Sequence, residues 1–423
     1  MGVPLPHLFH FPIDDVTIKI TACDIDSAIL ARNIFLLSYI VKHQERLEQA
    51  AASDDELLDN LWSIYYHFFL TGDALDLLQR HALELASASV SLEDWNSSLY
   101  GDTFGFISKT TLVEVSSFWR NYVDTSGSFG AGQNEKDARK TISDINTKHV
   151  RDTISITGFC SAGIHGMKSI RVFSECFQAY WATGVIAGNH KDREALGAAR
   201  GGTVHPLLAF SSSPFDGFCV HYGSDPLLGF HLAPVFDTDD FNRETLAELA
   251  KAQFRSWSRA FARYVKANAI KIEVHHGDAV NLCYKLQKNP SLASTTSTYV
   301  RPWSAKPLVL DFTACEEAGP CHSYDVIDMS NLLDHVGLLN LLPAAVPLLL
   351  MSPQSVMYTE SLLVAAEDPS QSLQALLRSD ITTLSLMLGV APVGHLVGVT
   401  DYASGLEDFM FASSNGNLGQ KSQ

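Results

Sequence analysis

The fold class is decided by one stretch near the start of the chain, Lys19-Ile-Thr-Ala-Cys-Asp-Ile-Asp-Ser-Ala-Ile-Leu-Ala-Arg-Asn33. Residues 19–23 are β-prone and predict a strand, whereas residues 27–40 change to the apolar period of a helix. Asp24 and Asp26 lie between these two segments. Acidic residues at the carboxyl end of a strand that opens a helix are typical of α/β folds, where they hold a ribose by its hydroxyls.

The segment before this stretch does not complete such a site. Nucleotide-binding α/β folds usually place a strand, a glycine-rich turn and a helix ahead of the acidic residue. Residues 1–18 contain one glycine, Gly2, and leave no room for these three elements. Residues 152–166, with glycines at 158, 163 and 166 ahead of a predicted helix, are one possible replacement. An ordinary insertion strand and loop is the other interpretation of that segment.

Length and composition limit the class of protein. At about 150 residues per domain, 423 residues predict two or three domains. Hydrophobic residues make up 46% and charged residues 18%, as in globular proteins, and the net charge of −17 disfavours nucleic acid and acidic membrane surfaces as partners. Seven scattered cysteines without a signal-peptide pattern predict free thiols in the cytoplasm.

Strand signals concentrate at the two ends of the chain, and the middle is mainly helical. Helical periods cover residues 54–88, 110–122, 239–267 and 370–389, and strands are expected at 270–275, 308–312, 324–327 and 348–351. The pattern predicts an α/β fold whose core, residues 1–45 plus 265–400, is interrupted by a mainly helical insertion, residues 46–264. Residues 401–423 form a polar tail that we expect to be partly disordered.

Three polar segments are expected to meet in one pocket. The first holds Asp24 and Asp26, the second is Lys271-Ile-Glu-Val-His-His-Gly-Asp-Ala279, and the third is Tyr324-Asp-Val-Ile-Asp-Met-Ser-Asn-Leu-Leu-Asp-His335. Ligands of open α/β sheets bind beyond the carboxyl ends of the strands, where these segments would converge. The alternative for each segment is structural, because Asp and Gly also terminate strands and cap helices.

Longer runs of specific residues extend the comparison over most of the chain. They are Cys23-Asp-Ile-Asp26, Leu30-Ala-Arg-Asn33, Trp62-Ser-Ile-Tyr-Tyr-His-Phe68, Trp95-Asn-Ser-Ser-Leu-Tyr-Gly101, His221-Tyr-Gly-Ser-Asp-Pro-Leu-Leu-Gly-Phe-His231, Gly277-Asp-Ala279, Asp325-Val-Ile-Asp-Met-Ser-Asn-Leu-Leu-Asp-His335, Tyr358-Thr-Glu360 and Leu384-Ser-Leu-Met-Leu-Gly-Val-Ala-Pro392. With these runs the chain resembles the fungal family called domain of unknown function 4470, whose N-terminal region is shared with dynein axonemal assembly factors. More broadly, it is similar to class I S-adenosylmethionine-dependent methyltransferases.

The resemblance implies a Rossmann-like, class I methyltransferase-type sheet and a set of site residues. Asp24 or Asp26 would bind the ribose and Asp278 would lie near the adenine. The further cofactor-binding candidates are Gly277, Ala279, Asp328 and Ser330. Ser330, Asn331, Asp334 and His335 would face the methyl acceptor, with His335 as a possible base.

The chain also departs from that family. Its members often begin with a glycine-rich turn of the type Gly-Cys-Gly-Asp and carry a MYND-type zinc finger, and this chain shows neither. No metal site is expected, because His275 and His276 would point to opposite faces of a strand and Cys315, Cys321 and His322 lack a fourth neighbour. A surface loop is the simpler interpretation of the latter group.

Three hypotheses about function follow from these observations. The first is a methyltransferase-like protein that is non-catalytic or impaired and acts in protein interaction or assembly. The second is an S-adenosylmethionine-dependent methyltransferase of unknown acceptor, so the sequence does not decide whether the protein is an enzyme. The third is a module that binds a nucleoside or another small ligand.

Overall fold

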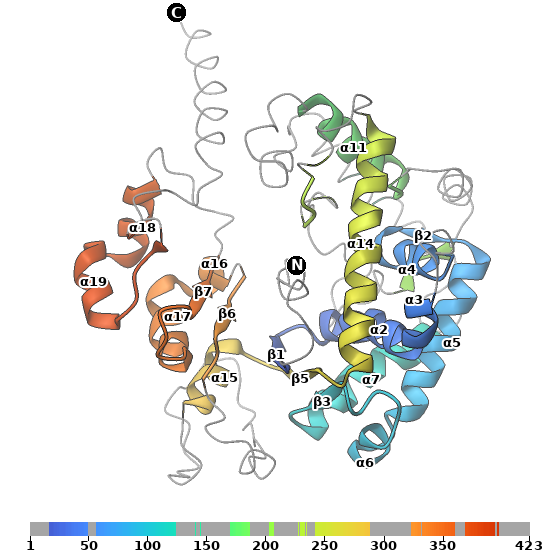
Figure 1. Ribbon diagram of the computed structural model, residues 1–423, viewed down its shortest axis with the longest axis horizontal. Coiled ribbons are helices and arrows are strands. Elements are labelled where there is room, and N and C mark those ends of the chain that lie inside the picture. Colours follow the sequence, from blue (N-terminus) through green and yellow to red (C-terminus); the bar gives the residue numbers. More distant parts are fainter. Residues whose placement is uncertain are drawn as a thin grey trace, which may run out of the picture. The chain divides into compact units, whose positions relative to one another are not determined.

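The computed structural model describes residues 17–49, 56–123, 140, 144, 170–186, 203–206, 227, 229–232, 234, 242–287, 323–330, 332–359, 369–393 and 396 (Figure 1). The chain divides into two compact units. The N-terminal unit is Pro4–His276, and the C-terminal unit is Gly277–Gln423 together with Met1–Val3. In both units the described residues form a mixed α/β structure with small parallel sheets.

A parallel sheet of three strands joins distant parts of the N-terminal unit. Strand β5 (Ile270–His276) lies between β1 (Ile18–Asp24) and β3 (Phe104–Phe106). The pairing of β1 with β5 runs in register from Ile18 opposite Ile270 to Asp24 opposite His276. All three strands are parallel, so their carboxyl ends lie at one edge of the sheet.

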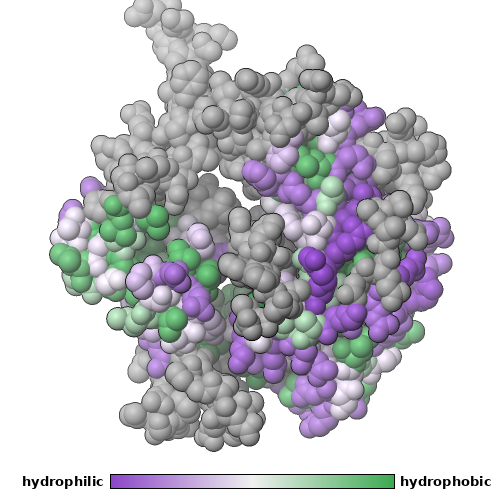
Figure 2. Space-filling view, viewed as in Figure 1, coloured by the Kyte–Doolittle hydropathy of each residue, from purple (hydrophilic) through white to green (hydrophobic). Residues whose placement is uncertain are grey.

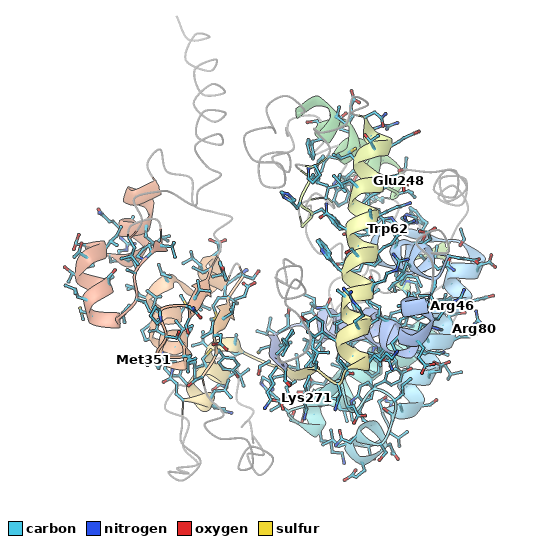
Figure 3. All side chains as sticks on the ribbon, viewed as in Figure 1. Arg46, Trp62, Arg80, Glu248, Lys271 and Met351 are labelled. Atoms are coloured by element: carbon cyan, nitrogen blue, oxygen red, sulfur yellow. The ribbon has the colours of Figure 1, made fainter. Side chains whose placement is uncertain are left out.

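The central strand β5 shows which face of this sheet is covered. Ile270, Ile272 and Val274 are buried, whereas Lys271 and Glu273 between them are exposed (Figure 3 labels Lys271). Alternation of this kind places one face of a strand on a core and leaves the other in water. A doubly wound sheet would bury both sets of side chains, so the Rossmann-like, methyltransferase-type part of the expected fold stays a prediction.

Helices supply most of the core of the N-terminal unit. Helix α2 (Ser27–Lys42) follows β1 directly, and twelve of its side chains are buried. The other helices are α3 (Gln44–Gln49), α4 (Glu56–Tyr66), α5 (Gly72–Ala88), α6 (Leu92–Asn96), α7 (Lys109–Val123), α11 (Ile170–Thr183) and α14 (Arg243–Lys266). A two-residue strand, β2 (Phe69–Leu70), pairs antiparallel with β4 (Thr203–Val204).

Two tryptophans fix the packing of α2, α6 and α7. The indole N–H of Trp119 donates to the carbonyl oxygen of Ala31 at 3.0 Å, and that of Trp95 donates to the carbonyl oxygen of Phe104 at 2.7 Å. The two indole rings stack, with centroids 5.5 Å apart and planes inclined by 17°. Both side chains are completely buried, so their polar atoms are satisfied inside the core.

The C-terminal unit is built around a smaller sheet. Strands β6 (Val326–Asp328) and β7 (Val356–Tyr358) pair in parallel, and an isolated bridge joins Tyr324 to Leu349. The helices are α15 (Ala279–Leu286), α16 (Leu332–Val336), α17 (Leu338–Ala345), the 3-10 helix η6 (Val346–Leu348), α18 (Pro369–Leu377) and α19 (Ile381–Leu388). One hydrophobic cluster, which includes Val280, Met329, Leu341 and Ile381, joins these elements.

Several predicted elements are confirmed. The strand at 19–23 is β1, the helix from 27 is α2, and the segments at 110–122, 239–267 and 270–275 are α7, α14 and β5. The helical segment at 54–88 consists of two helices with β2 between them. The segment at 370–389 is also two helices, because Asp380 caps a new one by accepting the N–H of Thr383 at 2.9 Å.

One predicted strand is wrong and others lie outside the described residues. Residues 348–351 contain the end of η6 and a single bridge at Leu349, because Pro347 lies in the first turn of a 3-10 helix. The segments at 152–166 and 308–312, Cys315, Cys321 and His322, and the tail at 401–423 are outside the described residues. The domain boundaries at 45, 264 and 400 also stay a prediction, although β1 and β5 do pair across the segment between them.

Candidate functional site

Two of the predicted carboxylates lie at the carboxyl edge of the N-terminal sheet. Asp24 is the last residue of β1, and one of its carboxylate oxygens accepts the backbone N–H of Asp26 at 2.8 Å. Asp26 is the N-cap of α2, because its Oδ1 accepts the backbone N–H of Ala28 at 2.9 Å. Each acid therefore has one oxygen in the turn between strand and helix, which is the structural role that the sequence left open.

His276 lies opposite Asp24 at the end of β5. Its Nε2 is 2.9 Å from the carbonyl oxygen of Ile25, and its Nδ1 contacts the carboxylate of Glu114 on α7. Both partners are hydrogen-bond acceptors. The imidazole thus links the turn after β1 to helix α7.

The start of α7 completes this edge. The backbone N–H of His276 donates to Oγ1 of Thr111 at 3.2 Å, and Ser108 Oγ accepts the backbone N–H of Thr111 at 3.1 Å. Side chains therefore tie the end of β5 to the turn between β1 and α2 and to helix α7, and β3 joins β5 through its backbone. This is the place in an α/β sheet where ligands usually bind.

Several neighbours affect the pKa of Asp24. Burial raises the pKa of Asp24 above its usual value, the N–H of Asp26 lowers it, and the negative charge of Asp26 raises it again. The positive charge of His276 lowers the pKa of Asp24. Only one oxygen of this carboxyl group takes part in the hydrogen bond of the turn. The other can accept hydrogen bonds from hydroxyl groups, such as those of a ribose.

The predicted residues of the C-terminal unit also have local structural roles. Asp278 is the N-cap of α15 and accepts the backbone N–H of Asn281 at 2.8 Å, with Gly277 before it and Ala279 as the first helical residue. Asp328 ends β6 and accepts the backbone N–H of Ser330 at 2.8 Å. Ser330 has a positive φ of 45°, a tight turn that this hydrogen bond stabilises.

The candidates for the acceptor side lie on or next to a short helix of the same unit. Asp334 and His335 belong to α16, where Asp334 is half-buried and His335 is exposed, and Asn331 lies outside the described residues. Val280 and Met329, which adjoin the two predicted cofactor segments, belong to one hydrophobic cluster. The structure thus places Asp24 and Asp26 together in the N-terminal unit. In the C-terminal unit, the segments of Asp278 and Asp328 contribute to the same hydrophobic core.

The sequence did not single out Glu114 and Thr111. Both lie on the side of α7 that meets the end of β5, and nothing in the helical period marks them as different from solvated residues. The available signal was Ser108 three residues before Thr111, a capping pattern at a helix start. Contact with His276 comes only from tertiary packing.

The comparison with known families identifies one segment. Residues 13–70 match the family model described as Domain of unknown function (DUF4470). This segment contains β1, α2, Asp24 and Asp26, so the match supports the predicted family over these residues. No curated protein and no solved structure matches the chain significantly.

Within the described part of the chain, no group of three His, Cys, Asp or Glu side chains is placed to hold a metal ion, and the expectation of a metal-free protein stays a prediction. Across the same residues, no helix combines the length and the apolar character needed to cross a membrane.

Proposed function

We propose that this chain is a methyltransferase-like cytoplasmic protein, non-catalytic or catalytically impaired, that acts in protein interaction or assembly. The observation that carries the proposal is a set of large apolar side chains exposed on the C-terminal unit. Figure 2 shows apolar residues gathered over α18 and α19. Met351 is fully exposed, and Leu386 and Met387 on α19 are 81% and 75% exposed.

Exposure of this kind is unusual for side chains that only support a fold. Contiguous apolar surface on a soluble protein commonly marks a site of protein interaction. The carboxylates singled out for catalysis or cofactor binding support the same proposal, because Asp26, Asp278 and Asp328 each accept a backbone N–H in a turn or cap. Their positions are accounted for without a bound cofactor.

The test compares partners captured by matched variants. The double variant Leu386→Ser, Met387→Ser removes apolar surface from α19, and Leu83→Ser removes a 54% exposed leucine from α5. The proposal expects specific partners of the native chain to be lost from the double variant and kept by Leu83→Ser. Identical partner sets for the native chain and both variants would contradict it.

The second candidate function is S-adenosylmethionine-dependent methyl transfer. It is favoured by the position of Asp24 at the carboxyl end of a parallel strand, directly before a helix, which fits a residue that binds ribose hydroxyls. The cofactor supplies the methyl group, and the residues of the chain would bind it and align the acceptor. Methyl transfer that survives replacement of Asp24 and Asp26 together by Ala would count against this role. A site for another nucleoside is the third candidate.

A further inference from the structure

A cavity lies in the N-terminal unit where α2 passes into α3. Its volume is about 300 Å³, and its lining residues are Val41, Lys42, His43, Gln44, Glu45, Arg46 and Leu99. This size is at the lower end of the range of small-molecule sites, ~300–1,000 Å³. The cavity is separate from the edge of the sheet that holds Asp24, because it adjoins the opposite end of α2.

Two of the lining side chains are held in place by neighbours. Nζ of Lys42 is 2.6 Å from both carboxylate oxygens of Glu84, and Glu84 in turn lies 3.7 Å from Nδ1 of the buried His81. The ring of His43 packs on Tyr39 with centroids 4.6 Å apart. The wall of the cavity therefore presents an oriented ammonium group and a fixed imidazole.

Three of the lining side chains are charged. Lys42 and Arg46 are positive and Glu45 is negative, and the ammonium group of Lys42 is paired with the carboxylate of Glu84. Arg46 makes no hydrogen bond or ion pair within the described part of the chain. Figure 3 shows Arg46 and Arg80 on the same side of the unit, and the positive charge of each acts to lower the pKa of Tyr39.

The pKa of His43 reflects both its burial and the charges near it. Burial, the largest cause, together with the positive charges of Lys42, His81 and Arg46 lowers this pKa to about 4, and the negative charge of Glu84 acts against them. The ring is thus neutral near pH 7, able to donate one hydrogen bond and accept another.

We propose that this cavity binds the phosphate group of a small phosphomonoester. A phosphomonoester carries a charge of about −1.5 to −2 near pH 7 and offers three strong acceptor oxygens to Arg46, His43 and Lys42. Guanidinium groups bind such oxygens through paired hydrogen bonds. Val41 and the exposed Leu99 provide apolar contact for the organic part of the ligand. The site is independent of the proposed interaction function.

The test is a calorimetric titration of the full chain with phenyl phosphate and with inorganic phosphate at constant ionic strength. We expect saturable binding of phenyl phosphate that is at least fivefold tighter than binding of inorganic phosphate. Arg46→Gln should weaken phenyl phosphate binding about tenfold, because it removes a charge that has no partner among the residues that the structure describes. Leu99→Asp, which puts a negative charge at an exposed position in the wall, should abolish binding without affecting folding.

The control is Arg120→Gln, an exposed arginine on α7 outside the cavity, which should bind phenyl phosphate like the native chain. Three results would each overturn the proposal. They are no saturable binding of either probe, equal loss in Arg46→Gln and Arg120→Gln, and equal affinity for the two probes. The last result would mark an adventitious anion site without selectivity for a phosphomonoester.

Discussion

The two units of this chain use parallel strands in different ways. In the N-terminal unit β5 lies between two partners and buries the side chains of Ile270, Ile272 and Val274, whereas in the C-terminal unit β6 and β7 have three residues each and leave Val326 and Tyr358 exposed. A two-stranded sheet needs further packing to be stable in water. The difference teaches that the sheet of the first unit forms part of its core, while the sheet of the second unit leaves large side chains at its surface.

The largest expected effect separates these two kinds of packing. Trp119→Ala removes a buried indole, its stacking on Trp95 and its hydrogen bond to Ala31. It should lower the free energy of unfolding of the N-terminal unit by about 3–5 kcal/mol, measured by urea denaturation with far-UV circular dichroism. Trp119 lies in the N-terminal unit, so we expect the unfolding transition of the C-terminal unit not to move. A change below about 1 kcal/mol would contradict the described core.

The second effect is a pH dependence confined to the N-terminal unit. Burial lowers the pKa of His205 from 6.5 to about 3, so the unfolded chain binds this proton first as the pH falls. The stability that His205 contributes is therefore complete above pH 6.5 and lost toward pH 3, at roughly 1.4 kcal/mol per pH unit. Urea midpoints at pH 7, 6 and 5 measure this slope. His205→Gln, whose amide can still donate to Ile64, should show a smaller slope, and an unchanged slope would assign it to other groups.

The third effect contrasts Asp24 with Asp26. Asp26→Ala removes the N-cap of α2 and should destabilise the unit by about 1 kcal/mol. Asp24→Asn keeps an acceptor for the N–H of Asp26 but removes a charge whose burial raises the pKa, so near pH 7 it should be neutral or stabilising. Thermal melting of both variants at pH 7 checks the order. Equal destabilisation would mean that the charge of Asp24 is needed for the fold.

The smallest effect is expected on the exposed surface. Leu386→Ser and Met387→Ser should each change the free energy of unfolding by less than about 0.5 kcal/mol, because both side chains are mostly in water. Urea denaturation of the single variants measures this. A loss above about 1.5 kcal/mol in either variant would mean that the side chain belongs to the core of the C-terminal unit and is not available to a partner.

The sequence predicted the elements that carry strong local signals. β1 and α2 follow from a β-prone run, an acidic turn and a helical period, and all three are local. The strand β3 was not predicted, because Phe104-Gly-Phe106 is three residues long and is stabilised by pairing with the distant β5. The structure begins this segment with the 3-10 helix η6, where a strand was predicted at 348–351. The fixed φ of Pro347 suits a 3-10 turn as well as the end of a strand.

The candidate site was predictable only in part. Asp24 and Asp26 could be placed because strand ends and caps use recognisable residues. The contacts of His276 with Glu114 and Thr111 depend on how α7 packs on the sheet, and no spacing in the sequence encodes that packing. The cavity at the α2–α3 junction likewise depends on Leu99, a residue distant in sequence from the rest of the lining.

Isothermal titration calorimetry of the full chain with S-adenosylmethionine tests the central proposal most directly. If the protein is a non-catalytic relative of methyltransferases, the titration shows no saturable heat at micromolar concentrations of the cofactor. Saturable micromolar binding that disappears in the variant Asp24→Ala, Asp26→Ala would assign the carboxyl edge of the N-terminal sheet to the cofactor and contradict the proposal.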